Sequence, residues 1–121
     1  MGKYFDPKDK TSPYWENSTL YTHNGILFLD GVRRSIDIKT EAYTLNELDG
    51  VIICNSTTAF TVTLPVASGS GQIYFIKNIN TGAVTLDGNS GDIIDVATTQ
   101  ILGQWDAMQI VDYAANKWVI V

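Results

Sequence analysis

Thr61-Val62-Thr63-Leu64-Pro65 is the stretch of sequence that decides the fold class. Polar and apolar residues alternate along it, as in a strand with one buried face, and the proline ends the strand because it cannot donate a ladder hydrogen bond. Later segments repeat this pattern beside residues that favour turns. They cover residues 72–77, 83–86, 108–111 and 117–121. The sequence therefore predicts an all-β module that reaches the C-terminus.

The rest of the chain supports the same fold class. No segment shows helical periodicity over the roughly ten residues that an amphipathic helix needs. About ten short strands separated by turns are typical of a sandwich or a barrel. We predict a compact antiparallel β-sandwich or small barrel over residues 41–121. An extended N-terminal arm over 1–19 and a β-hairpin or meander over 20–40 are expected to precede it.

The chain has 121 residues and a single cysteine, Cys54. A chain of this length buries enough surface to fold as one domain without a disulfide. Cys54 ends the apolar run Val51-Ile52-Ile53-Cys54, where a thiol behaves as a small hydrophobe. We expect it to be buried and unreactive, since free cysteine is among the most buried residue types.

The net charge of −5 is unevenly distributed. Residues 1–39 carry six basic and five acidic side chains, whereas residues 40–121 carry two basic and eight acidic ones. Nucleic-acid binding needs Lys and Arg clustered on one surface. The acidic module is therefore expected to have no nucleic-acid partner.

The sequence shows neither a membrane span nor a secretion signal. No apolar run approaches the ~20 residues of a membrane span. The first residues lack the apolar core of a signal peptide. We expect a soluble protein that is made in the cytoplasm and has no membrane partner.

The N-terminal arm combines a polar, proline-containing sequence with many aromatic side chains. Five of the 13 aromatic residues of the chain lie in its first 21 residues. Spacers are depleted in aromatics, whereas binding hot spots are enriched in them. The arm is therefore predicted to bind a partner, with the alternative that it folds back over the core of the module. The candidate binding residues are Tyr4, Phe5, Tyr14, Trp15 and Tyr21.

Two dipeptides, Asn24-Gly25 and Asp30-Gly31, predict a three-stranded meander over residues 20–40 because both favour two-residue hairpin turns. In the third strand, every second residue from Val32 to Ile38 is predicted to lie on one half-buried face. Arg34 interrupts this face and is a possible subunit contact. A side chain that snorkels at the rim of a sheet is the alternative.

Three groups of residues in the module could in principle bind an ion, cleave a sugar or hold a phosphate. The acidic turn at 87–92 lacks the third ligand and the final glutamate of a calcium loop, so a plain turn is favoured over an ion site. The carboxylates do not suggest a glycosidase, because no large sugar-binding groove is predicted. The segment at 68–71 lacks the lysine and the helix of a phosphate loop. We expect no enzymatic activity, no metal and no cofactor.

Two tryptophans of the module could form a platform for carbohydrate binding. Trp118 alternates with Ile120 in the last predicted strand, so we expect it to lie in the core. Trp105 lies at a boundary between loop and strand. Burial in the core or at a subunit interface is favoured for both, because tryptophan buries a large area. Trp105 is therefore a possible interface residue.

The ordered segments of the module resemble a small β-domain that recurs in virion proteins of tailed bacteriophages, in tail fibres, head fibres and capsid decoration proteins. The resemblance covers residues 43–121. It implies a homotrimer and no catalytic site. The segments are YTL at 43–45, DGVIICNST at 49–57, TVTLPVA at 61–67, IYFIKNINTG at 73–82, VTLDGNSGDIID at 84–95 and VDYAANKWVIV at 111–121.

Together the arm and this resemblance give an expected function. The chain is expected to be a capsid decoration (cement) protein or a short head fibre, located in the virion after assembly in the host cytoplasm. The arm would bind the major capsid protein or another virion protein, and the β-module would trimerise. The alternative is a receptor-binding module of a tail fibre that recognises glycans on the host surface.

Overall fold

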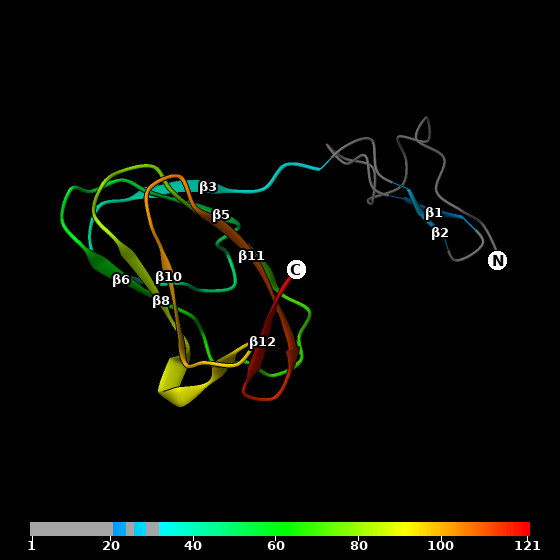
Figure 1. Ribbon diagram of the computed structural model, residues 1–121. Helices are drawn as coiled ribbons and strands as arrows, with labels where there is room; N and C mark the ends of the chain where they lie inside the picture. Colours follow the sequence, from blue (N-terminus) through cyan, green and yellow to red (C-terminus); the bar gives the residue numbers. More distant parts are fainter. Residues whose placement is uncertain (1–20, 24–25, 29–31) are drawn as a thin grey trace. The chain divides into compact units, whose positions relative to one another are not determined.

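A computed structural model describes residues 21–23, 26–28 and 32–121 of the chain (Figure 1). The chain divides into two units, residues 1–33 and residues 34–121. Within the smaller unit, β1 (Tyr21–His23) and β2 (Ile26–Phe28) pair antiparallel, with Tyr21 opposite Phe28. These are the first two strands of the predicted meander. The expected third strand belongs instead to the larger unit.

Ten strands and one short 3-10 helix make up residues 34–121, all of which the structure describes. The strands are β3 (Ile36–Lys39), β4 (Tyr43–Thr44), β5 (Val51–Cys54), β6 (Phe60–Thr63), β7 (Ile73–Asn78), β8 (Val84–Asp87), β9 (Ile93–Ile94), β10 (Thr99–Leu102), β11 (Ala107–Ala114) and β12 (Lys117–Ile120), and the helix is η2 (Asn89–Gly91). No described helix is long and apolar enough for a membrane crossing.

These strands form two sheets that pack face to face. The first has the order β10-β8-β6-β4, and the second has the order β3-β5-β7-β11-β12-β9. Figure 1 shows β6, β8 and β10 in one layer and β5, β11 and β12 in the other. The predicted all-β sandwich is therefore confirmed. The sheets remain open at their edges, so the alternative of a closed barrel is wrong.

The prediction of an antiparallel fold is also wrong, because both sheets are mixed. β3, β5 and β7 run parallel to one another, and so do β4, β6 and β8. From β3 to β11, successive strands alternate between the two sheets. Each sheet therefore receives every second strand. As far as β8 the strands of one sheet run the same way, whereas β10 and β11 pair antiparallel with β8 and β7. The turn residues of the sequence mark where strands end, but they do not tell which sheet the chain enters next.

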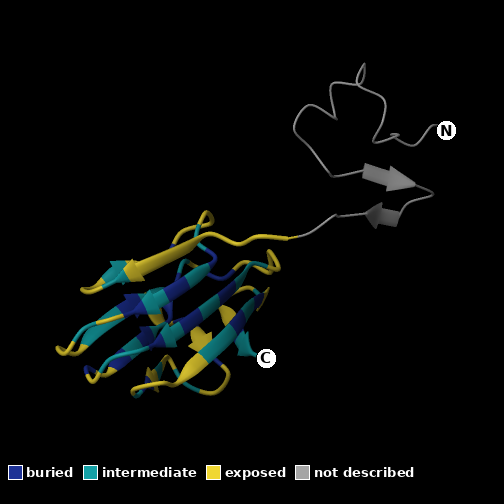
Figure 2. Ribbon diagram, turned by 90° about the horizontal axis from the view of Figure 1, so that it is seen from above, coloured by how far each residue is buried: buried dark blue, intermediate teal, exposed yellow. Residues whose placement is uncertain are grey.

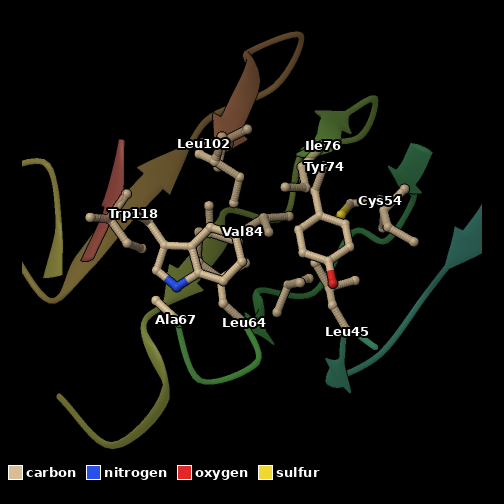
Figure 3. Packing of buried hydrophobic residues seen from close by; sticks show 14 residues of the cluster. Leu45, Cys54, Leu64, Ala67, Tyr74, Ile76, Val84, Leu102 and Trp118 are labelled. Atoms are coloured by element: carbon tan, nitrogen blue, oxygen red, sulfur yellow. The ribbon is translucent and has the colours of Figure 1, made fainter. Parts of the chain in front are cut away.

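The core lies between the two sheets and is made of the inward-facing side chain of every second strand residue. Its largest members are Trp118 and Tyr74, whose ring centroids lie 5.8 Å apart (Figure 3). Trp118 is buried, as predicted. Cys54 is also fully buried, and burial raises the pKa of its thiol to about 11. The predicted burial of Cys54 is confirmed, and its thiol stays protonated at neutral pH.

Two buried polar side chains hold the links between the sheets. Asn78 donates from Nδ2 to the carbonyl oxygens of Gly82 and Leu102. Asp92 accepts hydrogen bonds from the backbone N–H of Ala67 and from Nδ2 of Asn116. Each of these side chains is fully paired, so neither leaves a buried polar group that would cost free energy. They fix the positions of loops whose sequence alone does not specify them.

Candidate functional site

The outer face of the six-stranded sheet is unusually apolar for a surface that faces solvent. On β5 and β7 the buried residues alternate with Val51, Ile53, Ile73 and Phe75, which point away from the core and are only partly buried. Val111 and Val119 occupy the same outward positions on β11 and β12. We call this surface the apolar face. It comprises Ile36, Ile38, Val51, Ile53, Ile73, Phe75, Val111 and Val119.

Strand register brings these side chains into continuous rows. Ile36 lies opposite Val51, which lies opposite Phe75 on the next strand. Ile73 lies opposite Val111, which lies opposite Val119. Neighbouring strands are about 4.8 Å apart, so the side chains within a row are in contact distance. The apolar face is therefore one connected patch.

The edge strand β3 makes this patch more exposed. Ile36 and Ile38 are 69% and 59% exposed, and Val32, just before the strand, is 66% exposed. The prediction that these residues lie on a half-buried face is wrong. Among the described strands, β3 pairs with β5 on one side only, and none covers its outer edge. Figure 2 shows the contrast between such exposed segments and the striped, partly buried central strands.

A hollow deepens the middle of the apolar face. It has a volume of about 290 Å³ and lies over β5, β7 and β11, where Val51, Phe75 and Gln109 contribute to its wall. The charged residues at the outward positions of this sheet are Lys77 and Lys117. A hollow of this kind can take an apolar side chain, and Lys77, which lines it, can pair with an acidic group.

Arg34, the first of the two predicted interface residues, lies against the apolar face. Its guanidinium carbon is 5.1 Å from the ring centroid of Phe75, within the range of a cation–π contact. The aliphatic part of an arginine covers apolar surface while its head stays in water. The structure thus places Arg34 on the candidate site. That it touches another subunit stays a prediction.

Trp105, the second, lies at the rim of the same face. It is 62% exposed, and the Lys77 ammonium donates a hydrogen bond to its carbonyl oxygen and lies 6.0 Å from its ring centroid. Its φ of 71° is in the left-handed region, which costs a bulky residue about 1–2 kcal/mol. Strain of this kind at an exposed aromatic favours a role in binding over a role in folding.

The predicted arm residues cannot be placed in the same way. Tyr4, Phe5, Tyr14 and Trp15 lie outside the described residues. Tyr21 lies in β1, where the structure describes the backbone pairing with β2. Their role in binding a partner stays a prediction.

The outer face of the four-stranded sheet has the opposite character. Its outward positions on β6 and β8 are Thr61, Thr63, Thr85 and Asp87. Thr61 lies opposite Thr85, and Thr63 lies opposite Asp87. Hydroxyl and carboxylate groups in rows of this kind are well solvated. This surface needs no protein cover.

The acidic turn at 87–92 is held by its own side chains. Asp92 is buried and faces Ala67 and Asn116 rather than solvent. Ser90 adopts a left-handed φ of 52° within η2. Among the described residues, no group of three or more His, Cys, Asp or Glu side chains is placed to hold a metal ion. The carboxylate of Asp92 therefore acts in this structure as an anchor between two loops.

No protein-family model matches this chain, and no curated protein matches its sequence. The apolar face, with its cationic neighbours, is therefore the feature from which a function can be inferred. Sequence reasoning missed most of this face, although the unbroken apolar runs at 51–54 and 73–76 carried a signal. Strands that are apolar at every position are typical of sheets covered on both faces.

Proposed function

We propose that this chain is a structural protein of a tailed-bacteriophage virion. In this proposal it is a capsid decoration (cement) protein or a short head fibre that assembles as a homotrimer through the apolar face. The observation that carries the proposal is the connected apolar patch on an outer sheet face. Large exposed patches of this kind mark interaction sites, since isolated subunits rarely leave them open to water.

A second copy of the same chain is the partner favoured for this face. Homo-oligomers with closed symmetry are the commonest assemblies of soluble proteins. The outer edge of β3, which pairs with no other described strand, adds a reason, because an edge strand with isoleucine side chains invites unspecific pairing unless it is covered. The resemblance to trimeric virion domains supports three copies rather than two.

The arm supplies attachment in this proposal. Tyr4, Phe5, Tyr14, Trp15 and Tyr21 would anchor it on the major capsid protein or on another virion protein. An aromatic anchor at an interface is worth ~2 kcal/mol or more. Three arms on one trimer engage a repeating lattice together, so their combined binding exceeds that of a single arm.

Removal of residues 1–18 tests the attachment step. The truncated protein should stay trimeric in light scattering and should no longer co-sediment with undecorated capsids, because folding and attachment reside in different segments. Trp15→Ala should weaken capsid binding, whereas Tyr113→Ala, at an exposed tyrosine of the module, should leave it unchanged. Undiminished capsid binding by the truncated protein would contradict the assignment of the arm.

A receptor-binding module of a tail fibre is the second candidate function. It is supported by Trp105, an exposed and strained aromatic residue in a loop, which could stack on a sugar ring. This alternative makes the arm dispensable for binding to host cells. It makes Trp105, or the turn at 87–92, essential. Binding of the Trp105→Ala variant and of the truncated protein to host cells separates the two functions.

A further inference from the structure

The six-stranded sheet ends in β3 on one side and in β9 on the other, and at each end an aspartate side chain accepts a hydrogen bond from a backbone N–H. A sheet edge presents N–H and C=O groups with which a strand of another chain can pair. The groups that these two aspartates occupy therefore bear on whether copies of this chain can join edge to edge.

On β3, the backbone of Ile38 points away from the neighbouring strand. The carbonyl oxygens of Ser35 and Lys39 accept hydrogen bonds from N–H groups in and just after β5. Because backbone groups alternate in direction along a strand, those of Ile36 and Ile38 face the outer edge. Oδ1 of Asp37 accepts the N–H of Ile38 at 3.0 Å. An outward amide of this edge is thus occupied by a side chain of its own strand.

A lysine holds the Asp37 carboxylate in place. Nζ of Lys39 lies 2.8 Å from Oδ2 of Asp37, which leaves Oδ1 for the amide. The hydrogen bond from Lys39 lowers the pKa of Asp37, so the carboxylate is charged at neutral pH. In the ladder, these two residues lie opposite Ile52 and Cys54, which are fully buried, so both charges lie on the inner side of the strand. Inward-pointing charges on an edge strand disfavour the addition of another strand.

The opposite edge repeats this arrangement with different residues. β9 pairs with the first two residues of β12. The N–H of Val121 donates to Gln109 on β11, so the alternation places the N–H of Ile120 on the β9 side, beyond the end of β9. Oδ1 of Asp95, the residue after β9, accepts this N–H at 2.9 Å. The backbone N–H of Asp95 donates to the Trp118 carbonyl oxygen at 3.0 Å, which fixes the aspartate beside β12.

We propose that Asp37 and Asp95 close both edges of the six-stranded sheet to strand addition, so that copies of this chain associate through the side chains of the apolar face. We call these two residues the edge caps. An incoming strand would bring a carbonyl oxygen against a carboxylate that already holds the amide, and the carboxylate would lose water. The side chains of Ile36 and Ile38 stay open for packing, since they belong to the apolar face. Pairing of one edge with the other would instead repeat from copy to copy without closing.

The test removes both edge caps and measures the size of the assembly. Asp37→Ala removes one acceptor, and Asp95→Gly removes the other while it accommodates the left-handed φ of 59°. The control combines Glu47→Ala, in the turn before β5, with Asp87→Ala in β8, and so removes the same charge elsewhere. In sedimentation velocity, the uncapped protein should form larger species whose share rises with concentration, and the control should keep the size of the parent. Pairing at each uncapped edge should strengthen at least about tenfold, the effect of one hydrogen bond.

The outcome separates the edge caps from the proposed homotrimer, on which the choice of the apolar face rests. A monomeric parent whose uncapped variant grows would keep the edge caps and remove the homotrimer. An uncapped variant that keeps the size of the parent, whether monomer or trimer, would overturn the proposal.

Amide hydrogen exchange of the ¹⁵N-labelled parent keeps the proposal testable if the uncapped variant fails to fold. The N–H groups of Ile36 and Ile38 both face the outer edge of β3, but Asp37 holds that of Ile38. After correction for intrinsic rates, the Ile38 amide should exchange at least about tenfold more slowly than the Ile36 amide. Equal exchange of the two amides would show that Asp37 does not occupy this edge and would overturn the proposal.

Discussion

The two outer faces of the sandwich are built on the same strand alternation, yet they carry different side chains. The four-stranded sheet shows mainly threonines and an aspartate to solvent, with one exposed isoleucine, Ile101, whereas the six-stranded sheet shows isoleucine, valine and phenylalanine in connected rows. Both sheets bury an apolar inner face, so folding of the subunit does not explain the difference. It is explained if one face stays in water and the other meets protein. Under the proposed assembly, the contrast separates residues needed for the fold from residues needed for association.

The largest effect is expected when a charge is placed on the apolar face. Phe75→Asp should raise the dissociation constant of the oligomer at least about 100-fold, because a buried aromatic anchor is replaced by a carboxylate that must lose its water. Sedimentation equilibrium at micromolar concentration measures this. Thr85→Asp, at the corresponding depth on the other face, is the control and should leave the oligomer intact. If both proteins keep the size of the parent, the two faces do not differ in function.

Asp112 should affect the fold rather than assembly. Asp112→Asn should lower the free energy of unfolding by about 2–3 kcal/mol, since several hydrogen bonds to a charged acceptor are weakened. Urea unfolding at a fixed protein concentration measures this, because association also stabilises the folded state. Oligomer size at neutral pH should not change. Dissociation of the folded variant into monomers would mean that fold and assembly are not separable.

The effect of Asp112 should also depend on pH. Its pKa in the folded protein lies below that of the unfolded chain, which is about 3.9. Its stabilisation is therefore complete above that unfolded-state pKa and is lost as the pH falls through the folded-state pKa. The difference in stability between the parent and Asp112→Asn should be full at pH values near 7 and should shrink below about pH 4. A difference that stays constant into acid would show that the charge of Asp112 does not stabilise the fold.

Replacement of Trp105 should have an intermediate effect, with opposite signs for the stability of the subunit and for its self-association. Trp105→Gly removes an exposed ring and relieves a positive φ, so the stability of the subunit should stay equal or rise by up to about 1 kcal/mol. Self-association should weaken roughly tenfold if the ring contributes to the interface. Trp105→Ala keeps the strain and serves as the control for the backbone. Unchanged association in both variants would remove Trp105 from the interface.

The smallest effect is expected at Arg34. Arg34→Ala removes a cation–π contact with Phe75 that is worth about 0.5–1 kcal/mol at an exposed site, so association should weaken only two- to fivefold. Arg33→Ala removes the same charge from the neighbouring residue and should have no such effect. Titration by analytical ultracentrifugation resolves this difference. Equal weakening by both variants would assign the effect to net charge.

Much of the subunit fold could be predicted from the sequence. Alternation in Thr61-Val62-Thr63-Leu64 identified the inward residues Val62 and Leu64, and both are fully buried. Trp118 was predicted in the core for the same reason. A period-two pattern is local to one strand, so it identifies the buried face even when the partner strands are unknown.

The pairing of the strands and the exposure of their side chains could not be predicted so well. The module was predicted to be antiparallel, yet the chain leaves β7 and enters β8 in the other sheet instead of pairing back on β7. Ile36 and Ile38 alternate like buried residues, but their strand lies at an edge that no other described strand covers. Local sequence specifies which side chains share a face, and only the assembled sheets decide what lies opposite that face.

The position of β3 has a mechanical consequence. This four-residue strand is the first element of the larger unit, and β5 is the one described strand with which it pairs. A pull that enters the unit from its N-terminal side reaches β3 before any other strand. The other strands carry force only after the short hydrogen-bond ladder between β3 and β5 breaks. β3 is therefore the strand expected to detach first under force. A neighbouring copy packed on Ile36 and Ile38 would hold β3 in place, so assembly would raise the force at which the subunit begins to unfold.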